Sequence, residues 1–216
     1  IYTSPHLVDF NERIQIDSQP VGDQTLIEAF ARCEAANFGE PITFFEITTA
    51  AAFLLFSEHP ADLLILEVGL GGRFDATNVI ANPILCVITA IGLDHQEFLG
   101  NEIAMIAHEK AGICKFGVPT IIGRQSPEAE AALIKEAHRV GALAYVWGQD
   151  YRAYQQHGRL TYEDESRVWD LPSPGLIGPH QIDNAGAAAA CAAVLQWPEK
   201  CVADGIAHAT WPARLQ

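Results

Sequence analysis

An acidic residue followed by a glycine-rich turn is the segment of this sequence with the clearest chemical potential. Residues 67–78 read Glu-Val-Gly-Leu-Gly-Gly-Arg-Phe-Asp-Ala-Thr-Asn and close an apolar run. A carboxylate at the end of a buried strand is costly unless something positive meets it. The alternative is a structural Glu67 that pairs with Arg73, with glycines that serve only the turn. The segment is not a dinucleotide fingerprint, because the spacing G-x-G-x-x-G is absent.

A histidine follows the next predicted strand. His95 lies just beyond the carboxyl end of the apolar run 83–90, and the carboxyl ends of parallel strands share one edge of a sheet. This position beside Glu67 favours a shared site for a hard cation such as Mg²⁺, which takes few protein ligands and leaves positions for phosphate and water. A structural histidine at a strand end is the alternative.

Two further segments carry polar side chains with either a structural or a chemical role. Lys110 stands near the end of a predicted helix, in Glu-Lys-Ala-Gly-Ile, where its charge could simply complement the helix dipole. Ser4 precedes Pro5 at the end of the first strand and is either a turn residue or a metal ligand. None of these four segments decides the function by itself.

Apolar runs that alternate with helical patterns must position these residues. We predict strands over 62–68, 83–90, 118–123 and 143–147, and helices over 25–37, 43–57, 101–111 and 127–140. This alternation predicts an α/β fold with a mainly parallel, doubly wound sheet flanked by helices. The run 62–68 is expected to be buried on both faces, as strands of such sheets are.

The pattern changes after residue 150. Residues 151–171 predict a β-hairpin and a further short strand, which together form a small antiparallel appendage. Helices are predicted over 181–197 and 199–209, on either side of Pro198. The sequence contains no convincing domain boundary, so residues 1–216 are expected to belong to one domain.

Composition and charge argue against several classes of function. The chain has 216 residues, 49% of them hydrophobic, and a net charge of −14 from 27 acidic and 13 basic residues. This acidity is unfavourable for a nucleic-acid or anionic-membrane partner, and no apolar run reaches the ~18 residues of a membrane span. Five cysteines without a Cys-x-x-Cys pair predict buried free thiols in a reducing compartment, so we expect a cytoplasmic protein.

The sequence resembles the folylpolyglutamate/dihydrofolate synthase family, a branch of the Mur-ligase superfamily. The resemblance runs from residue 2 to 216 through seven segments in the family's order: TSPHL, TFFEITTAAAF, EVGLGGRFDATN, ITAIGLDH, EKAGICK, GPHQIDNA and WPARLQ. It implies a Mur-ligase-like ATP-binding domain of an ATP-dependent amide ligase. Such enzymes join L-glutamate to dihydropteroate, or to the γ-carboxylate of folate and tetrahydrofolate polyglutamates, through an acyl phosphate. We also expect a monomer that acts on small molecules.

The resemblance assigns cofactor roles to residues of this sequence. Ser4, Glu67 and His95 match ligands of Mg²⁺, with two metal sites expected and His95 also counted as catalytic. Lys110 matches a catalytic lysine that is carbamylated, which would turn an ammonium into a carboxylate-like group near the second metal. Asn184 matches a contact to the nucleotide, and Arg214 matches an arginine that reaches the ATP phosphates.

The pterin and aminobenzoate part of the substrate is expected against two short segments: Thr43, Phe44, Phe45 and Glu46, and Phe74, Asp75 and Ala76. An aromatic pair and an acidic residue suit a flat heterocycle with amino donors, and core packing of one of the two rings is the alternative. The family usually has Leu at the position of Phe74 and Gly at that of Ala213. Phe74 therefore bears on substrate preference, and Ala213 bears on the stiffness of the hinge before Arg214.

The family's phosphate-binding loop has no counterpart in this sequence, which contains no G-x-x-x-x-G-K-[ST] or similar segment. The resemblance implies that this loop would precede Ile1 and that a second domain would follow Gln216, so the 216 residues alone are expected to be inactive. Two other hypotheses stay open: another Mur-type ligase acting on a cell-wall nucleotide precursor, and a non-catalytic binding or assembly module. Residues 43–46 and 67–78 favour the folate branch over the cell-wall branches.

Overall fold

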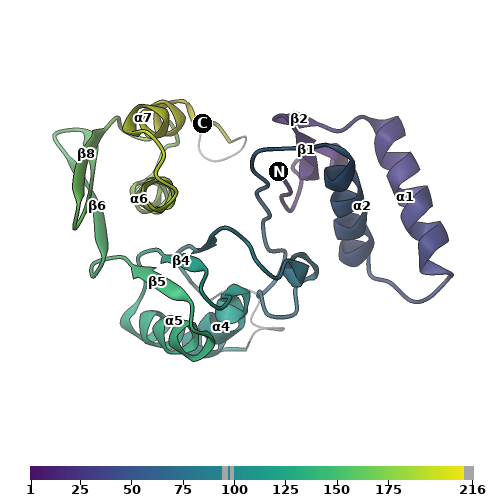
Figure 1. Cartoon of the computed structure of the whole chain (residues 1–216), viewed down its shortest axis with the longest axis horizontal. Coiled ribbons are helices and arrows are strands. Elements are labelled where there is room, and N and C mark those ends of the chain that lie inside the picture. The colour runs from purple at the N-terminus through teal and green to yellow at the C-terminus, as the bar shows by residue number, and fades with distance from the viewer. Residues whose placement is uncertain (94–96, 98–99, 212–216) are drawn as a thin grey trace. The chain divides into compact units, whose positions relative to one another are not determined.

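The computed structural model describes residues 1–93, 97 and 100–211. The chain divides into two compact units, residues 1–80 and 81–216, and each is described by itself. Figure 1 labels their α-helices and most of their strands. Among the described residues, no helix combines the length and the hydropathy needed to cross a lipid bilayer.

Two helices and several short segments build the first unit. Its elements are η1 (Phe10–Arg13), β1 (Gln15–Ile16), β2 (Gln19–Pro20), α1 (Asp23–Asn37), α2 (Phe44–Glu58) and η2 (Ala76–Val79). β1 and β2 pair antiparallel, and α1 and α2 lie side by side (Figure 1). Both helices were predicted to within two residues at each end.

The core of the first unit forms around Tyr2. This side chain is fully buried among residues of α1 and α2, including Leu26, Ala51 and Leu55. Its hydroxyl shares a hydrogen bond of 3.0 Å with Thr49 Oγ1, and burial raises the pKa of the Tyr2 phenol. The N-terminal segment is therefore anchored to α2 by both packing and a buried polar contact.

Among the described residues, the predicted strand over 62–68 pairs at one position only. Tyr2 and Leu66 form an isolated parallel bridge, in which Tyr2 N donates to Ile65 O at 2.8 Å and Glu67 N donates to Tyr2 O at 2.9 Å. Leu63, Leu64 and Ile65 are 37%, 38% and 52% exposed. The expectation of burial on both faces is wrong, because a single bridge brings only Leu66 against the core cluster.

The second unit contains the parallel sheet. Its strands are β3 (Cys86–Ile88), β4 (Pro119–Ile122) and β5 (Leu143–Val146), paired in that order and all parallel. The connecting helices are α4 (Ile103–Lys110), η3 (Ala111–Ile113) and α5 (Pro127–Val140). α5 has the predicted bounds, because Ser126 caps its first turn and Gly141, with φ 79°, ends it.

Helices cover both faces of this sheet. Along β4, Ile121 packs into a cluster with α6 (His180–Val194), and Ile122 packs into a second cluster with α4 and α5. Neighbouring side chains of a strand point to opposite faces, and Figure 1 shows α4 and α5 on one side of β4 and α6 on the other. The prediction of a doubly wound α/β fold is confirmed.

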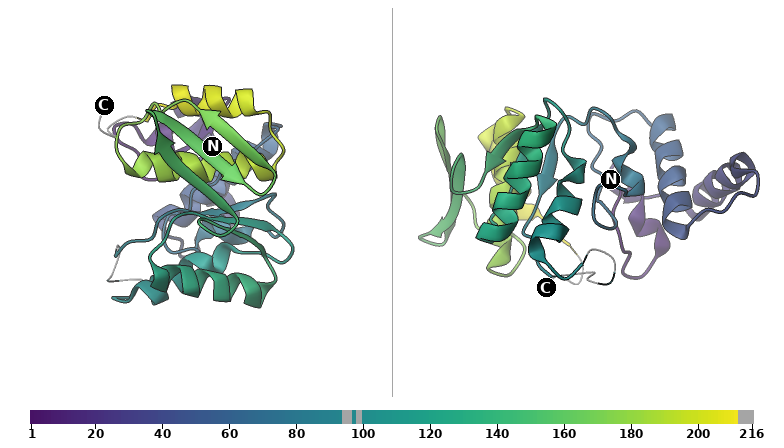
Figure 2. Two further views of the ribbon diagram at one scale, coloured as in Figure 1. Left: turned by 90° about the vertical axis from the view of Figure 1, so that its left-hand side faces the viewer. Right: turned by 90° about the horizontal axis from the view of Figure 1, so that it is seen from below.

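The antiparallel appendage is confirmed as well. β6 (Tyr151–Gln156), β7 (Arg159–Asp164) and β8 (Arg167–Leu171) form one antiparallel sheet. This sheet packs on α6 and α7 (Glu199–His208), in front of which it lies in the left view of Figure 2.

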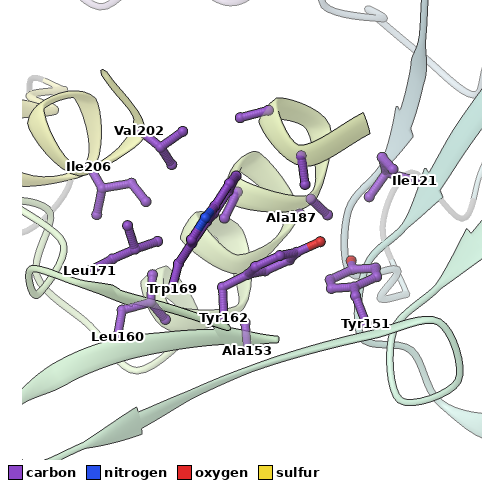
Figure 3. Close-up of a cluster of buried hydrophobic side chains, with 14 residues drawn as sticks. Ile121, Tyr151, Ala153, Leu160, Tyr162, Trp169, Leu171, Ala187, Val202 and Ile206 are labelled. Atoms are coloured by element: carbon purple, nitrogen blue, oxygen red, sulfur yellow. The ribbon is translucent and has the colours of Figure 1, made fainter. Parts of the chain in front are cut away.

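Aromatic side chains fill the space between this sheet and the helices. Figure 3 shows the Tyr162 ring between Tyr151 and Trp169, with centroid distances of 6.0 and 5.2 Å. α6 approaches β6 so closely that a Cβ at Gly186 would overlap the side chain of Ala153. The alanine-rich composition of α6 therefore serves close packing rather than helix propensity alone.

The five free cysteines differ in exposure. Cys86 and Cys114 are buried as predicted and Cys33 and Cys191 are half-buried, whereas Cys201 is exposed. The expectation of burial is wrong for Cys201, which is exposed on the wall of a groove between α6 and α7.

We expect the thiols to react in the order of their exposure. Burial raises the pKa of Cys86 to about 11 and that of Cys191 to about 12. Because the thiolate is the nucleophile, both stay protonated and slow at neutral pH, while Cys201 is modified first. Ellman's reagent with peptide mapping measures this order. Fast modification of Cys86 in the folded protein would contradict it.

Candidate functional site

Ser4 and Glu67 meet in the first unit. The parallel bridge between Tyr2 and Leu66 makes the two segments run in the same direction, so both end at the same edge. There the backbone N–H of Ser4 donates to Glu67 Oε2 at 3.0 Å. Glu67 is exposed and Ser4 is half-buried. The structure brings this pair together as the sequence suggested, and their role as metal ligands stays a prediction.

The chemistry of this pair is that of hard oxygen donors. Glu67 supplies a carboxylate and Ser4 a hydroxyl, and Mg²⁺ prefers such oxygens while keeping several waters. Within the part of the chain that the structure describes, no group of three His, Cys, Asp or Glu side chains could hold a metal ion. An ion bound by Glu67 and Ser4 would keep positions for water and phosphate.

Asp75 holds the glycine-rich turn that follows Glu67. Its Oδ2 accepts hydrogen bonds from the backbone N–H groups of Gly69 (3.1 Å) and Leu70 (2.9 Å). Its Oδ1 accepts from the backbone N–H (2.9 Å) and the hydroxyl (2.6 Å) of Thr77. The sequence predicted a substrate contact here and missed this organising role. The signal was present in Asp-x-Thr, a spacing at which the Asp side chain caps the following turn.

The two neighbouring phenylalanines of α2 have different surroundings. Phe45 is half-buried and packs on Tyr2, with ring centroids 6.0 Å apart. A Cβ at Gly69 would overlap the Phe45 ring, with Cε2 and Cε1 only 2.6 and 2.8 Å away. Phe44 is 62% exposed, and the Arg13 guanidinium lies over its ring at 5.6 Å. Phe45 is thus the packed ring and Phe44 the accessible one.

Thr43 and Glu46 form the capping box of α2. Glu46 Oε2 accepts from the backbone N–H (2.8 Å) and the hydroxyl (2.6 Å) of Thr43, and Thr43 Oγ1 accepts from Glu46 N–H at 3.2 Å. The hydrogen bonds from the Thr43 side chain and backbone lower the pKa of Glu46, so this exposed carboxylate is ionised at neutral pH. This capping role is sufficient to explain why Thr43 and Glu46 occur at the start of α2.

The remaining substrate candidates lie on the loop that leads into η2. Phe74 is 89% exposed and Ala76 begins η2. Because α2 and η2 are in contact, the structure places this loop near the start of the helix that carries Phe44. Binding of a substrate by these residues stays a prediction.

Two other candidates belong to the second unit. Lys110 is the last residue of α4 and is half-buried. Asn184 lies in α6, and its side-chain N–H donates to Gln181 Oε1 at 3.0 Å. It borders a largely apolar groove of about 290 Å³ between α6 and α7. His95, Ala213 and Arg214 lie outside the described residues.

Replacement of Asp75 by Asn is expected to loosen the turn after Glu67. The amide is uncharged and retains one acceptor oxygen where the carboxylate has two, so both pairs of donors lose a charged partner and one pair faces an amide NH₂ group instead. We expect a loss of stability of about 1–3 kcal/mol, measured by urea unfolding. Asp62→Asn, which removes one charge from the same unit without those four bonds, is the control. Equal stability of the two variants would contradict the organising role.

The sequence of this chain is similar to a known protein family and to known enzymes. The family model described as "Mur ligase middle domain" matches residues 27–192. Folylpolyglutamate synthase of Lacticaseibacillus casei is 37% identical over 100% of this chain and 54% of its own length. Dihydrofolate synthase/folylpolyglutamate synthase of Bacillus subtilis (strain 168) is 36% identical with the same coverage.

A solved structure agrees with these relatives. The structure titled "E.coli FolC in complex with DHPP and ADP" is 35% identical, with a TM-score of 0.90 over 100% of this chain and 51% of that chain. The chain spans about half the length of the curated relatives it matches. These findings confirm the resemblance carried by the sequence motifs. The chain belongs to the Mur ligase family, whose middle domain it contains.

Proposed function

We propose that the chain serves in an ATP-dependent amide ligase that joins L-glutamate to dihydropteroate, to the γ-carboxylate of folates, or to both. The observation that carries this proposal is the contact between Ser4 and Glu67 at the carboxyl ends of two parallel segments. The relatives named above are folylpolyglutamate and dihydrofolate synthases, and the solved neighbour holds ADP and DHPP. These names support the same substrates for this protein.

The proposed reaction has two steps. A carboxylate oxygen of the pteroate or folate attacks the γ-phosphorus of ATP, which forms an acyl phosphate and releases ADP. The amine nitrogen of glutamate then attacks the acyl carbon, the bond from that carbon to the phosphate oxygen breaks, and the amine loses a proton. The products are an amide and inorganic phosphate. Positioning and charge neutralisation supply most of the catalysis in such a transfer.

Residues of this chain are proposed to hold the metal. Glu67 and Ser4 fit Mg²⁺ because they offer adjacent oxygen donors at an accessible edge. Mg²⁺ bound there would neutralise charge on the ATP phosphates. His95 and a carbamylated Lys110 are proposed to complete two sites, and mass spectrometry of the Lys110 peptide, recovered under conditions that preserve carbamates, tests the modification.

Other residues are proposed to bind the organic ligands. The exposed Phe44 ring and the ionised Glu46 carboxylate suit a flat heterocycle with amino donors. Phe74 and Ala76 would close the same pocket, with Asp75 holding their loop. Asn184 and Arg214 are proposed to bind ATP. We also propose a cytoplasmic monomer that acts on small molecules, and the net charge of −14 favours the monomeric state.

An assay of the intact protein tests this proposal. Dihydropteroate and tetrahydrofolate are supplied in parallel with ATP, Mg²⁺ and glutamate, and both ADP and the glutamylated product are quantified. We expect ADP and product in equal amounts, dependent on one or both folate substrates. Turnover only with a cell-wall nucleotide precursor would indicate another Mur-type ligase. Absence of turnover with every substrate would indicate a non-catalytic module.

A further inference from the structure

A cation, an indole and a carboxylate meet in the second unit. Arg124 follows β4 and Trp147 follows β5, so both stand at the carboxyl ends of neighbouring parallel strands. The guanidinium carbon of Arg124 lies 4.9 Å from the centroid of the Trp147 ring. Its Nη1 lies 3.9 Å from Oδ1 of Asp183 in the first turn of α6.

Asp183 immediately precedes Asn184, the proposed nucleotide contact. It is the acidic residue of the first turn of α6, and its side chain is 29% exposed. The Asn184 amide is held by Gln181, which is itself buried. An uncompensated carboxylate at this position would repel the triphosphate of ATP. A cation beside Asp183 would remove most of this repulsion.

Arg124 is well placed to be that cation. The indole of Trp147 supports its planar guanidinium, an arrangement that lysine reproduces less well. The side chain of Arg124 is still 59% exposed, and such a surface ion pair contributes little to stability. The arrangement of Arg124, Trp147 and Asp183 is therefore better explained by the electrostatic field it sets at the start of α6 than by the stability of the fold.

We propose that Arg124 is a positioning residue of the nucleotide site, which compensates Asp183 so that Asn184 can approach the negatively charged nucleotide. This inference rests on the proposed function. It predicts an effect on ligands that carry phosphate and little effect on the nucleoside alone. It also predicts that removal of Asp183 cancels the effect of removing Arg124.

The test compares Arg124→Ala, Asp183→Asn and the double variant in the intact protein, with Kd for ATP and for adenosine measured by calorimetry. We expect Arg124→Ala to raise the Kd for ATP about fivefold, with a smaller change in the Kd for adenosine. Asp183→Asn should bind ATP at least as tightly as the wild type, and the double variant should return to within about twofold of it. Arg124→Lys should retain part of the affinity.

The matched control is Arg159→Ala. Arg159 is 48% exposed and pairs with Asp170 across the antiparallel sheet, so its loss removes a comparable surface ion pair. It should leave the Kd for ATP unchanged. If Arg124→Ala binds ATP like the wild type, or if the double variant does not recover, the inference is overturned. A wild type that binds no ATP would instead refute the proposed function, and this inference with it.

Discussion

Replacement of Glu67 by Gln is expected to abolish glutamate ligation and leave the fold intact. The Glu67 side chain is exposed and accepts a hydrogen bond from Ser4 N–H, which a Gln carbonyl oxygen can also accept. The amide carries no charge, so it cannot neutralise a divalent cation. We expect kcat/KM to fall by at least about 100-fold, with a higher Mg²⁺ requirement in whatever activity remains.

Glu34→Gln provides the matched control for this variant. Glu34 is an exposed residue of α1 in the same unit, so its replacement makes the same change in net charge. Activity and melting temperature of both variants are measured under identical Mg²⁺ concentrations. Wild-type activity of Glu67→Gln would contradict the metal role. Loss of activity together with unfolding would indicate a structural glutamate instead.

Replacement of Gly69 by Ala is expected to cause a large loss of stability. The added methyl group would overlap the Phe45 ring, which cannot easily withdraw because it packs on the buried Tyr2. Overpacking of this kind costs about 1–3 kcal/mol. The same clash would displace the turn held by Asp75, so activity should fall with stability. Urea unfolding gives the free energy, and the ligation assay gives the activity.

The double variant Gly69→Ala with Phe45→Leu separates the clash from other causes. Leucine is shorter than phenylalanine, so it leaves room for the new methyl group. We expect the double variant to be more stable than the sum of the two single changes predicts, since the two residues are in contact. Additive losses, or a Gly69→Ala protein as stable as the wild type, would show that the approach of Phe45 does not constrain this position.

Local signals account for the elements that were predicted well. α5 carries a Ser126 cap, a proline at its first position and a glycine at its end, so its bounds could be predicted from sequence. The run 62–68 carries an equally clear strand pattern, but pairing depends on neighbours far away in the chain. Its only described partner is the segment of Tyr2, and most of its apolar side chains are exposed. The bounds of α5 therefore depend on local sequence, whereas the pairing of 62–68 depends on contacts with distant parts of the chain.

The candidate site shows the same division. The meeting of Ser4 and Glu67 was expected from the family resemblance, which matches both residues to metal ligands, and the parallel bridge of Tyr2 and Leu66 explains it physically. The roles of Phe44 and Phe45 could not be separated from sequence, because the two residues are adjacent and differ only in their tertiary contacts, with Phe45 packed against Tyr2 and Gly69. The Asp-x-Thr spacing indicates only the contact of Asp75 with Thr77. The contacts with the backbone N–H groups of Gly69 and Leu70, which make Asp75 the organiser of the turn, have no sequence pattern of their own.

The isolated bridge between Tyr2 and Leu66 makes chain length matter more than side-chain identity at this edge. The exposed residues Leu63, Leu64 and Ile65 can vary as long as the backbone stays extended. Insertion of one residue between Leu66, the bridge residue, and Glu67 would turn the carboxylate to the opposite side of the segment, away from Ser4. The side chains at positions 63–65 are therefore free to change during evolution, whereas the spacing from the bridge at Leu66 to Glu67 is fixed.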